Sequence, residues 1–334
     1  MNQVAVRTKS WRGRAAAAPV PQGAAVAVTP ALAVHKLVVP LPSGPLTLLD
    51  WQIGRGEKVA VIGRNGVGKT SVTEALLGVR EGAIVQGQML GFDVALWRRR
   101  PELRRRLGVQ LQRVAFPGRP RVRELVDTHR VLYPCTSARV MAALGIAELA
   151  PRLYEFLSRG ETQRVDLFLA MAHEPEILFL DEPFTGLDPQ FTKQLAALIR
   201  DLVDVAVVMS CHTVEELALV DKVAWLTGAG IARYDRPDTL RRELVGDFRL
   251  AVQCEDEASA VLLAHELRCR LAVEPAGAAA SPRRVLLDGL RCSVTGTEPM
   301  ADLARALADR PAVVAVESGR SSLQDLLRHC AREG

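Results

Sequence analysis

The chain has 334 residues, of which 49% are hydrophobic, and its formal net charge is +5. No stretch approaches ~18 uncharged apolar residues, so the sequence pattern excludes a membrane-spanning helix. The six cysteines are scattered without paired metal spacing, which indicates reduced thiols of a cytosolic protein and argues against a disulfide framework or a zinc site. Length and apolar content allow a sizeable core and about two domains of ~150 residues each.

Residues 1–28 are predicted to form a flexible basic tail. The first 49 residues contain no acidic side chain, and the alanine-rich apolar stretch is short and interrupted by Pro19 and Pro21. Such a stretch makes a poor signal peptide. The composition also resembles an organellar transit peptide, which stays open as the alternative.

Residues 29–243 are predicted to form an α/β domain with a largely parallel sheet. Three short β-branched or aliphatic runs, at 57–63, 176–183 and 204–212, have the pattern of buried parallel strands. Helical stretches alternate with them, and a hairpin is expected to turn at Gly228–Gly230.

A helical subdomain is predicted within this domain at about residues 114–164, where helical spacing dominates. Arginines cluster just before and at its start, between residues 98 and 123. A solvated helix face is the plain interpretation, and a surface beside anionic lipid or a membrane partner is the alternative. The cluster lacks the interleaved aromatic residues of a nucleic-acid site, so no nucleic acid is expected as a partner.

Residues 244–334 are predicted to form a small accessory α+β domain. Five short strands are expected in it, at 248–254, 270–274, 283–289, 290–296 and 312–318. Three helices are expected at 256–269, 298–310 and 321–333.

A phosphate-binding loop follows the first buried strand. A glycine, four further residues and then Gly-Lys-Thr match the pattern whose backbone N–H groups surround phosphates at a helix N-terminus. In this pattern Lys69 reaches the terminal phosphates and Thr70 offers its hydroxyl to Mg²⁺. The predicted nucleotide-binding residues here are Gly63, Arg64, Asn65, Gly66, Val67, Gly68, Lys69, Thr70 and Ser71.

Polar residues end the other two buried strands. Asp181 follows Leu180, at a place where a carboxylate faces the phosphate loop and can hold Mg²⁺. The carboxylate of Glu182, one residue on, is expected to point toward an attacking water. His212 ends the third strand and is expected to face the same pocket.

Five motifs in order resemble the nucleotide-binding subunit of ATP-binding-cassette (ABC) transporters over about residues 30–240. They are GRNGVGKT, GVQLQ, LSRGETQR, ILFLDEP with GLDP, and SCH. The resemblance implies a P-loop NTPase fold that binds ATP and Mg²⁺. It also implies that Gln112 joins the two lobes and touches Mg²⁺ or the water, that Glu182 is the general base and that His212 is the γ-phosphate switch.

The resemblance further assigns Asp188 to a loop between subunits, and Ser158 and Gly160 to the signature that contacts ATP bound to the opposite chain. The family signature reads Leu-Ser-Gly-Gly-Gln, and here Arg159 and Glu161 replace its first glycine and its glutamine. The N–H groups can still face a phosphate while the arginine side chain points away. We therefore expect an intact signature rather than a helix cap alone.

A second departure concerns the adenine base. The family usually stacks an aromatic ring on adenine, but residues 35–49 contain no Phe, Tyr or Trp, and the only aromatic ring among them is that of His35, which is expected in a strand. Stacking of this kind is worth ~1–3 kcal/mol. We expect weaker or less base-selective binding, held mainly by phosphates and Mg²⁺.

One phosphate loop and one signature per chain imply a second nucleotide-binding chain, expected as a homodimer, and a separate transmembrane permease subunit. The C-terminal segment 322–325, Ser-Leu-Gln-Asp, is similar to the tail of bacterial drug and polyketide exporter subunits. This favours an exporter of a drug, antibiotic or other small hydrophobic compound, attached to the cytoplasmic face of the plasma membrane. A soluble non-transport ABC ATPase and a weakly hydrolysing regulatory subunit are the alternatives.

Overall fold

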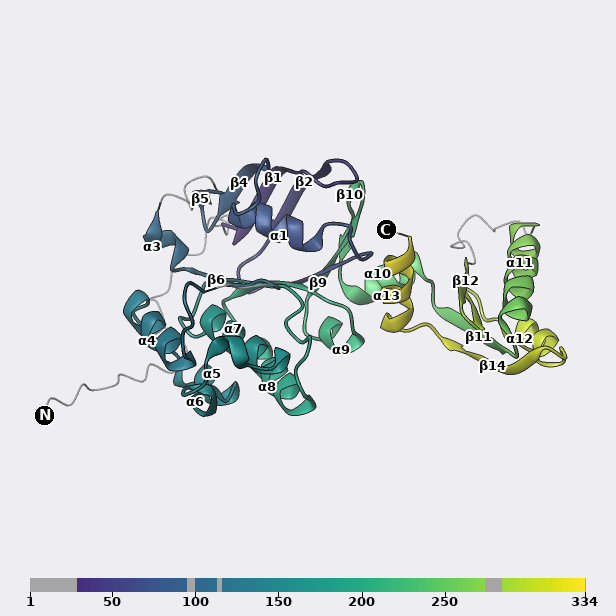
Figure 1. Cartoon of the computed structure of the whole chain (residues 1–334). Coiled ribbons are helices and arrows are strands. Elements are labelled where there is room, and N and C mark those ends of the chain that lie inside the picture. The colour runs from purple at the N-terminus through teal and green to yellow at the C-terminus, as the bar shows by residue number, and fades with distance from the viewer. Residues whose placement is uncertain (1–28, 95–99, 113–115, 274–283, 334) are drawn as a thin grey trace, which may run out of the picture.

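The computed structural model describes residues 29–94, 100–112, 116–273 and 284–333, and the predicted basic tail lies outside these residues (Figure 1). The chain forms a larger part up to about helix α10 (Pro237–Leu244) and a smaller accessory part beside it. The larger part has two buried apolar clusters as its core, and the accessory part has one.

A six-stranded sheet lies at the centre of the larger part. Its strand order is β10-β9-β3-β8-β7-β6, and all neighbouring pairs are parallel except β10 with β9. The predicted strands are confirmed as β3 (Lys58–Ile62), β7 (Ile177–Leu180) and β8 (Ala206–Ser210). Because these strands are parallel neighbours, the loops that follow them meet at one edge of the sheet.

Alternate residues of each strand are buried on opposite faces of this sheet. Val59 and Val61 of β3 pack toward α1 (Lys69–Leu77) and a second, antiparallel sheet of order β2-β1-β4-β5. Ala60 and Ile62 belong to the cluster on the other face, which the helices of the larger part other than α1 and α3 (Pro101–Arg104) cover.

The predicted helical insertion is confirmed between β6 and β7. Three helices, α4 (Val122–Leu132), α5 (Ala138–Ala143) and α6 (Ile146–Leu149), pack against α7 (Arg159–Met171). Phe168 on α7 is fully buried and belongs to the same apolar cluster as the inward residues of α4.

The accessory part is α+β, as predicted, and follows a β-α-β-β-α-β order with antiparallel sheet order β12-β13-β11-β14. One prediction was wrong: residues 270–273, expected as a strand, form the last turn of α11 (Glu257–Val273). The apolar residues of this segment continue the helical spacing of Ala260, Leu263 and Leu267, so they extend the helix.

The last helix, α13 (Leu323–Arg332), returns from the accessory sheet to the larger part (Figure 1). Leu326 and Cys330 are fully buried and join the cluster beneath the six-stranded sheet. The chain therefore crosses between the two parts twice, and the division predicted at residue 244 stays a prediction.

The other elements complete the two parts. In the larger part they are β1 (Leu32–Val39), β2 (Leu46–Ile53), β4 (Ile84–Met89), β5 (Phe92–Asp93), α3 (Pro101–Arg104), β6 (Leu107–Gln110), a 3-10 turn (Tyr154–Phe156), α8 (Pro189–Arg200), α9 (Val214–Leu217), β9 (Lys222–Thr227) and β10 (Gly230–Asp235). In the accessory part they are β11 (Phe248–Cys254), β12 (Arg284–Asp288), β13 (Arg291–Gly296), α12 (Ala301–Ala308) and β14 (Val313–Arg320).

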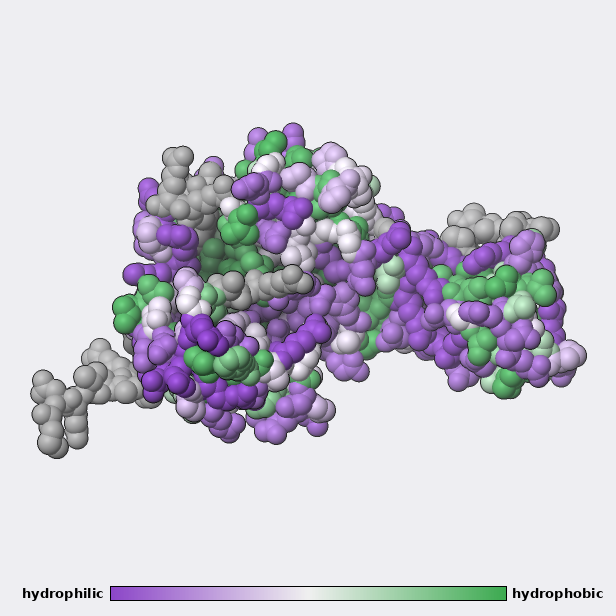
Figure 2. Space-filling view, in the orientation of Figure 1, coloured by the Kyte–Doolittle hydropathy of each residue, from purple (hydrophilic) through white to green (hydrophobic). Residues whose placement is uncertain are grey.

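The visible surface is mainly hydrophilic, with hydrophobic residues in separate groups (Figure 2). Among the described residues, none of the helices is both long and apolar enough to cross a bilayer.

Candidate active site

The phosphate loop connects β3 to α1 and depends on glycine at two crowded positions. Gly63 has a φ of 152°, and a Cβ there would lie 2.4 Å from the carbonyl oxygen of Leu226. Gly68 has a φ of 109°, and a Cβ there would lie 2.9 Å from Leu41 Cδ1. Gly63 therefore requires glycine for conformation and for space, and Gly68 requires it for its backbone conformation. The result is a tight turn at the N-terminus of α1, as phosphate binding needs.

Lys69 lies over this loop. Its Nζ donates to the carbonyl oxygens of Gly63, at 2.9 Å, and Arg64, at 3.3 Å. Burial lowers the pKa of Lys69, while the nearby carboxylates of Glu182 and Asp181 oppose that shift. The ammonium group thus lies in the loop between the backbone and two acids, where terminal phosphates would compete for it.

Asp181 is the centre of a hydrogen-bond network at the carboxyl edge of the sheet. Thr70 Oγ1 donates to Asp181 Oδ2 at 2.6 Å, and Ser210 Oγ donates to Oδ1 at 2.7 Å. The same Ser210 oxygen accepts from Glu182 N at 2.6 Å. Asp181 is only 4% exposed, so these partners satisfy a carboxylate that is nearly out of water. Strands β7 and β8 and helix α1 thereby converge on one carboxyl group.

Sequence reasoning missed Ser210 and Gln110 in this network. Gln110 is buried at the end of β6, and its Oε1 accepts from Asp181 N at 3.1 Å. A polar residue at the end of each apolar strand was the available signal. Which strands are neighbours was not known from the sequence.

Glu182 and His212 form a pair at the open side of the network. His212 Nε2 lies 3.3 Å from Glu182 Oε1, and the two side chains are 38% and 29% exposed. Glu182 adopts a φ of 51°, which is uncommon for a residue with a Cβ. Strained backbone of this kind is typical of functional positions. The two predicted residues are therefore brought together beside Asp181.

Gln112 lies just beyond β6 and its side chain is exposed. Among the described residues, none of the hydrogen bonds of the Asp181 network involves Gln112. The neighbouring residues 113–115 lie outside the described part of the chain. Its roles toward Mg²⁺ and water stay predictions.

Ser158 caps helix α7 in the single chain. Its Oγ accepts from Glu161 N at 3.4 Å, and Glu161 Oε2 accepts from Ser158 N at 2.8 Å, which makes a capping box. The backbone N–H of Ser158 holds the pKa of the Glu161 carboxyl below its ordinary value, despite partial desolvation. Glu161, where the family pattern has glutamine, thus has a clear structural role. The contact of Ser158 with ATP in a second chain stays a prediction.

Gly160 and Arg159 interlock with the loop that contains Gly186. A Cβ on Gly160 would lie 2.4 Å from Gly186 O, and a Cβ on Gly186 would lie 3.2 Å from Arg159 Cγ. Arg159 therefore points along the Gly186 loop, and its side chain is exposed. Asp188, at the end of this loop, accepts from Gln190 N and begins α8.

The signature helix also touches the catalytic edge of its own chain. Gln163 Nε2 donates to Pro183 O at 2.9 Å and to Glu182 O at 3.3 Å. A displacement at the start of α7 would therefore be transmitted to the backbone of Glu182.

The oxygen donors at the site suit a hard divalent cation. Thr70 presents a hydroxyl and Asp181 a carboxylate within 2.6 Å of each other, next to the phosphate loop. Mg²⁺ is commonly bound by one or two such groups together with substrate phosphates. These residues fit Mg²⁺ bound with a nucleotide.

In the described part of the chain, an aliphatic side chain, and no aromatic ring, packs against Gly68 of the phosphate loop. Leu41 lies against Gly68 of the phosphate loop, and His35 is an exposed residue of β1. His35 is in a strand, as predicted.

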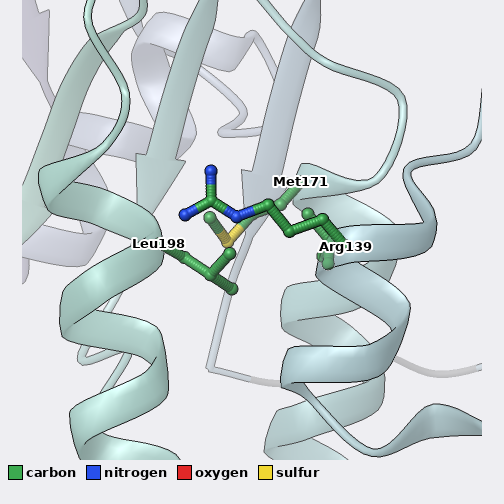
Figure 3. Close-up of a pocket in the computed structure, with 4 residues that line it drawn as sticks. Arg139, Met171 and Leu198 are labelled. Atoms are coloured by element: carbon green, nitrogen blue, oxygen red, sulfur yellow. The ribbon is translucent and has the colours of Figure 1, made fainter. Parts of the chain in front are cut away.

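Two hollows lie elsewhere in the molecule. The first is a gap among helices α5, α7 and α8 that has no room for water and is lined by Arg139, Val140, Met171 and Leu198. The side chain of Arg139 extends past Met171 and Leu198 (Figure 3). An open groove of about 490 Å³ lies near Gly54–Glu57 and Asp221–Lys222. Neither is lined by residues of the phosphate loop.

A parallel sheet with a glycine-rich loop, a lysine and a threonine–aspartate pair at its carboxyl edge defines a P-loop nucleoside triphosphatase. Residues 46–185 match the sequence profile of the ABC transporter family.

Similar proteins of known family and a solved structure agree with the match to the family profile. An ABC transporter ATP-binding protein of Streptomyces coelicolor is 36% identical over 211 residues, which cover 59% of this chain and 77% of that protein. The phosphonates import ATP-binding protein PhnC 1 of Pseudomonas syringae pv. syringae is 33% identical over 189 residues, 50% of this chain and 71% of that protein. A solved ATP-binding subunit of an ABC transporter has a TM-score of 0.56 at 21% identity and covers 63% of this chain and 92% of that one.

The chain belongs to the family of ABC transporter ATP-binding proteins, and it is an ATP-binding ATPase subunit.

Proposed function

We propose that two copies of this chain hydrolyse ATP at shared sites and drive export of a small hydrophobic compound, such as a drug or antibiotic, through a separate membrane subunit at the cytoplasmic face of the plasma membrane. The observation that carries the hydrolytic part is the joining of Thr70, Asp181, Glu182 and His212 at the edge of the phosphate loop.

Each residue has a distinct task in this proposal. Lys69 and the loop N–H groups bind the terminal phosphates, and Thr70 and Asp181 hold Mg²⁺, which supplies charge neutralisation on the phosphates when bound. Glu182 accepts a proton from the attacking water. His212, 3.3 Å from that carboxylate, orients it and contacts the γ-phosphate. Gln112 completes the water position.

The second chain supplies Ser158 and Gly160 to the γ-phosphate, and Asp188 lies where the two chains meet. Helix α7 offers its N-terminus for this purpose, which favours an anion. The interlock of Gly160 with Gly186 supports a rigid edge that could close over a nucleotide.

Two features are the basis for proposing export: the accessory part and the Ser322–Asp325 segment, which forms the capping box of α13. Import is the second candidate, because a relative at 33% identity is by name a phosphonates import protein. Co-reconstitution with the membrane subunit in vesicles, with ATP on the side of this chain, separates the two. Cargo leaving the ATP side supports export, and cargo arriving there supports import.

The hydrolytic role is tested by Glu182→Gln, which should lower turnover by ~10²–10⁴-fold while ATP binding is retained. Glu174→Gln, at an exposed acid before β7 and so at the end of the strand opposite to Glu182, is the control. Unchanged turnover in Glu182→Gln would remove Glu182 from the role of general base.

A further inference from the structure

Helix α13 connects the accessory part to the segment that carries His212. Its apolar side, with Leu326 and Cys330 fully buried, shares one cluster with Leu217 of α9 and Ile62 of β3. Figure 1 shows α13 beside α10, between the two parts of the molecule. The helix is therefore seated against the elements that frame the phosphate loop and the switch histidine.

The polar side of α13 is tied to the accessory sheet. Arg332 lies 3.1 Å from Asp288 at the end of β12, and Arg284 of β12 lies 2.8 Å from Glu333 just after the helix. Arg284 also donates to the ring of His329, which is only 2% exposed. A shift of the accessory sheet would thus pull on α13.

Glu216 is the residue of α9 that reaches His212. Its Oε2 accepts from Thr213 N at 3.2 Å, which is the ordinary capping-box contact, and from His212 N at 2.5 Å, one residue before the cap. Glu216 is only 8% exposed. The shorter bond goes to the histidine, so the carboxylate fixes the main chain of His212 in addition to beginning the helix.

The electrostatic surroundings agree with this geometry. Burial raises the pKa of Glu216, and the two backbone donors and His212 oppose that shift, whereas Glu182 adds to it. Cys211, fully buried before His212, also has a raised pKa, first from burial and then from Glu216. The Glu216 carboxylate thus contacts the main chain of His212 and is affected electrostatically by Glu182.

We propose that Glu216 is a positioning residue for ATP hydrolysis that acts through the main chain of His212, and that α13 holds α9 in place under the control of the accessory part. The proposal rests on the role given above to His212. It makes the accessory part a regulator of turnover that leaves the binding of ATP at the phosphate loop unchanged.

Exchange of the Glu216 side chain tests the first step. Glu216→Ala removes both acceptor contacts and should lower kcat by ~10-fold or more, as misplacement of a reacting group does, with KM for ATP unchanged. Glu216→Gln keeps an acceptor oxygen and should retain most of the turnover. Glu215→Ala, exposed on the same helix, is the control.

Normal kcat in Glu216→Ala would overturn the proposal, as would a loss of kcat in Glu216→Gln equal to that in Glu216→Ala. Absence of ATP hydrolysis in the unaltered chain would instead count against the proposed function, so the two failures are distinguishable.

The second step is tested without disturbing the apolar contacts of α13. Arg284→Gln combined with Arg332→Gln should lower kcat by ~3-fold or more and should add nothing in the Glu216→Ala background, because residues on one path are not additive. Arg310→Gln, which breaks a bidentate pair with Glu266 away from α13, should leave kcat unchanged. An unchanged kcat in the double variant, or a fully additive loss, would overturn control by the accessory part.

Discussion

Gly160→Ala sets two physical effects against each other at the start of α7. Alanine is the better helix former by ~0.5–1 kcal/mol, which alone predicts a more stable protein. The added Cβ, however, would lie 2.4 Å from Gly186 O, a backbone atom that cannot rotate away. Since an ordinary contact needs about 3.4 Å, α7 or the Gly186 loop must move by ~1 Å, and overpacking of this kind costs ~1–3 kcal/mol. The clash therefore outweighs the propensity.

The functional cost should be larger than the cost in stability. A ~1 Å misplacement near a reacting centre can cost ~10²-fold in rate, and α7 is linked to Glu182 O through Gln163. We expect kcat for ATP hydrolysis to fall by about that factor, measured by phosphate release at saturating ATP. Binding of ATP to the phosphate loop of a single chain, measured by calorimetry, should be unchanged because Gly160 is proposed to contact only the nucleotide of the second chain.

The matched control is Gly319→Ala in β14, where an added Cβ meets nothing within 4 Å. It should leave turnover unchanged and should raise the melting temperature slightly, because alanine is favoured over glycine by ~0.5–1 kcal/mol inside a strand. Full turnover with a raised melting temperature in Gly160→Ala would show that helix propensity dominates and would refute the packing argument.

Three further changes have separate readouts. Lys69→Ala should weaken ATP binding by ~10–100-fold in calorimetry, because a charge-assisted hydrogen bond to phosphate is worth ~1.5–3 kcal/mol; unchanged affinity would contradict its role. Leu41→Tyr places a ring beside the phosphate loop and should tighten the binding of ATP and of GTP alike by ~5-fold or more through stacking, and unchanged affinities would contradict it. Burial lowers the pKa of His129 to about 4. Below the ordinary histidine pKa of ~6.5, the folded state then binds fewer protons than the unfolded state. The contribution of neutral His129 to the free energy of unfolding is therefore fully present above that pH and is lost as the pH falls toward 4. Between pH 7.5 and pH 5, the free energy of unfolding measured with urea should fall by ~2 kcal/mol more in the wild type than in His129→Phe. Equal decreases in the two proteins would contradict this.

The local parts of the site could be predicted from sequence because they are continuous in the chain. Strand, glycine loop and helix follow one another at β3 and α1, and an apolar run ending in Asp181 marked the cation-binding edge. The accessory strands and helices were also recognisable by period, except where a short apolar run at residues 270–273 was compatible with either element.

The parts that could not be predicted depend on contacts between distant segments. Ser210 joins Asp181 only because β8 lies next to β7, and this adjacency is a property of the sheet order. The return of α13 to the core likewise required knowledge of where the accessory sheet begins and ends. The side chain of Arg159 likewise has room only because Gly186, a residue of a distant segment, has no Cβ.

The most direct test of the shared site is complementation between two inactive chains. One copy carries Lys69→Ala and the other a bulky replacement, Ser158→Arg, and each alone should be inactive. Mixed dimers contain one site with both residues intact, so a 1:1 mixture should regain up to ~25% of wild-type ATPase activity if the sites are independent and pairing is random. No recovery on mixing, together with full activity of wild-type chain shown to be monomeric, would contradict hydrolysis at a site built from two chains.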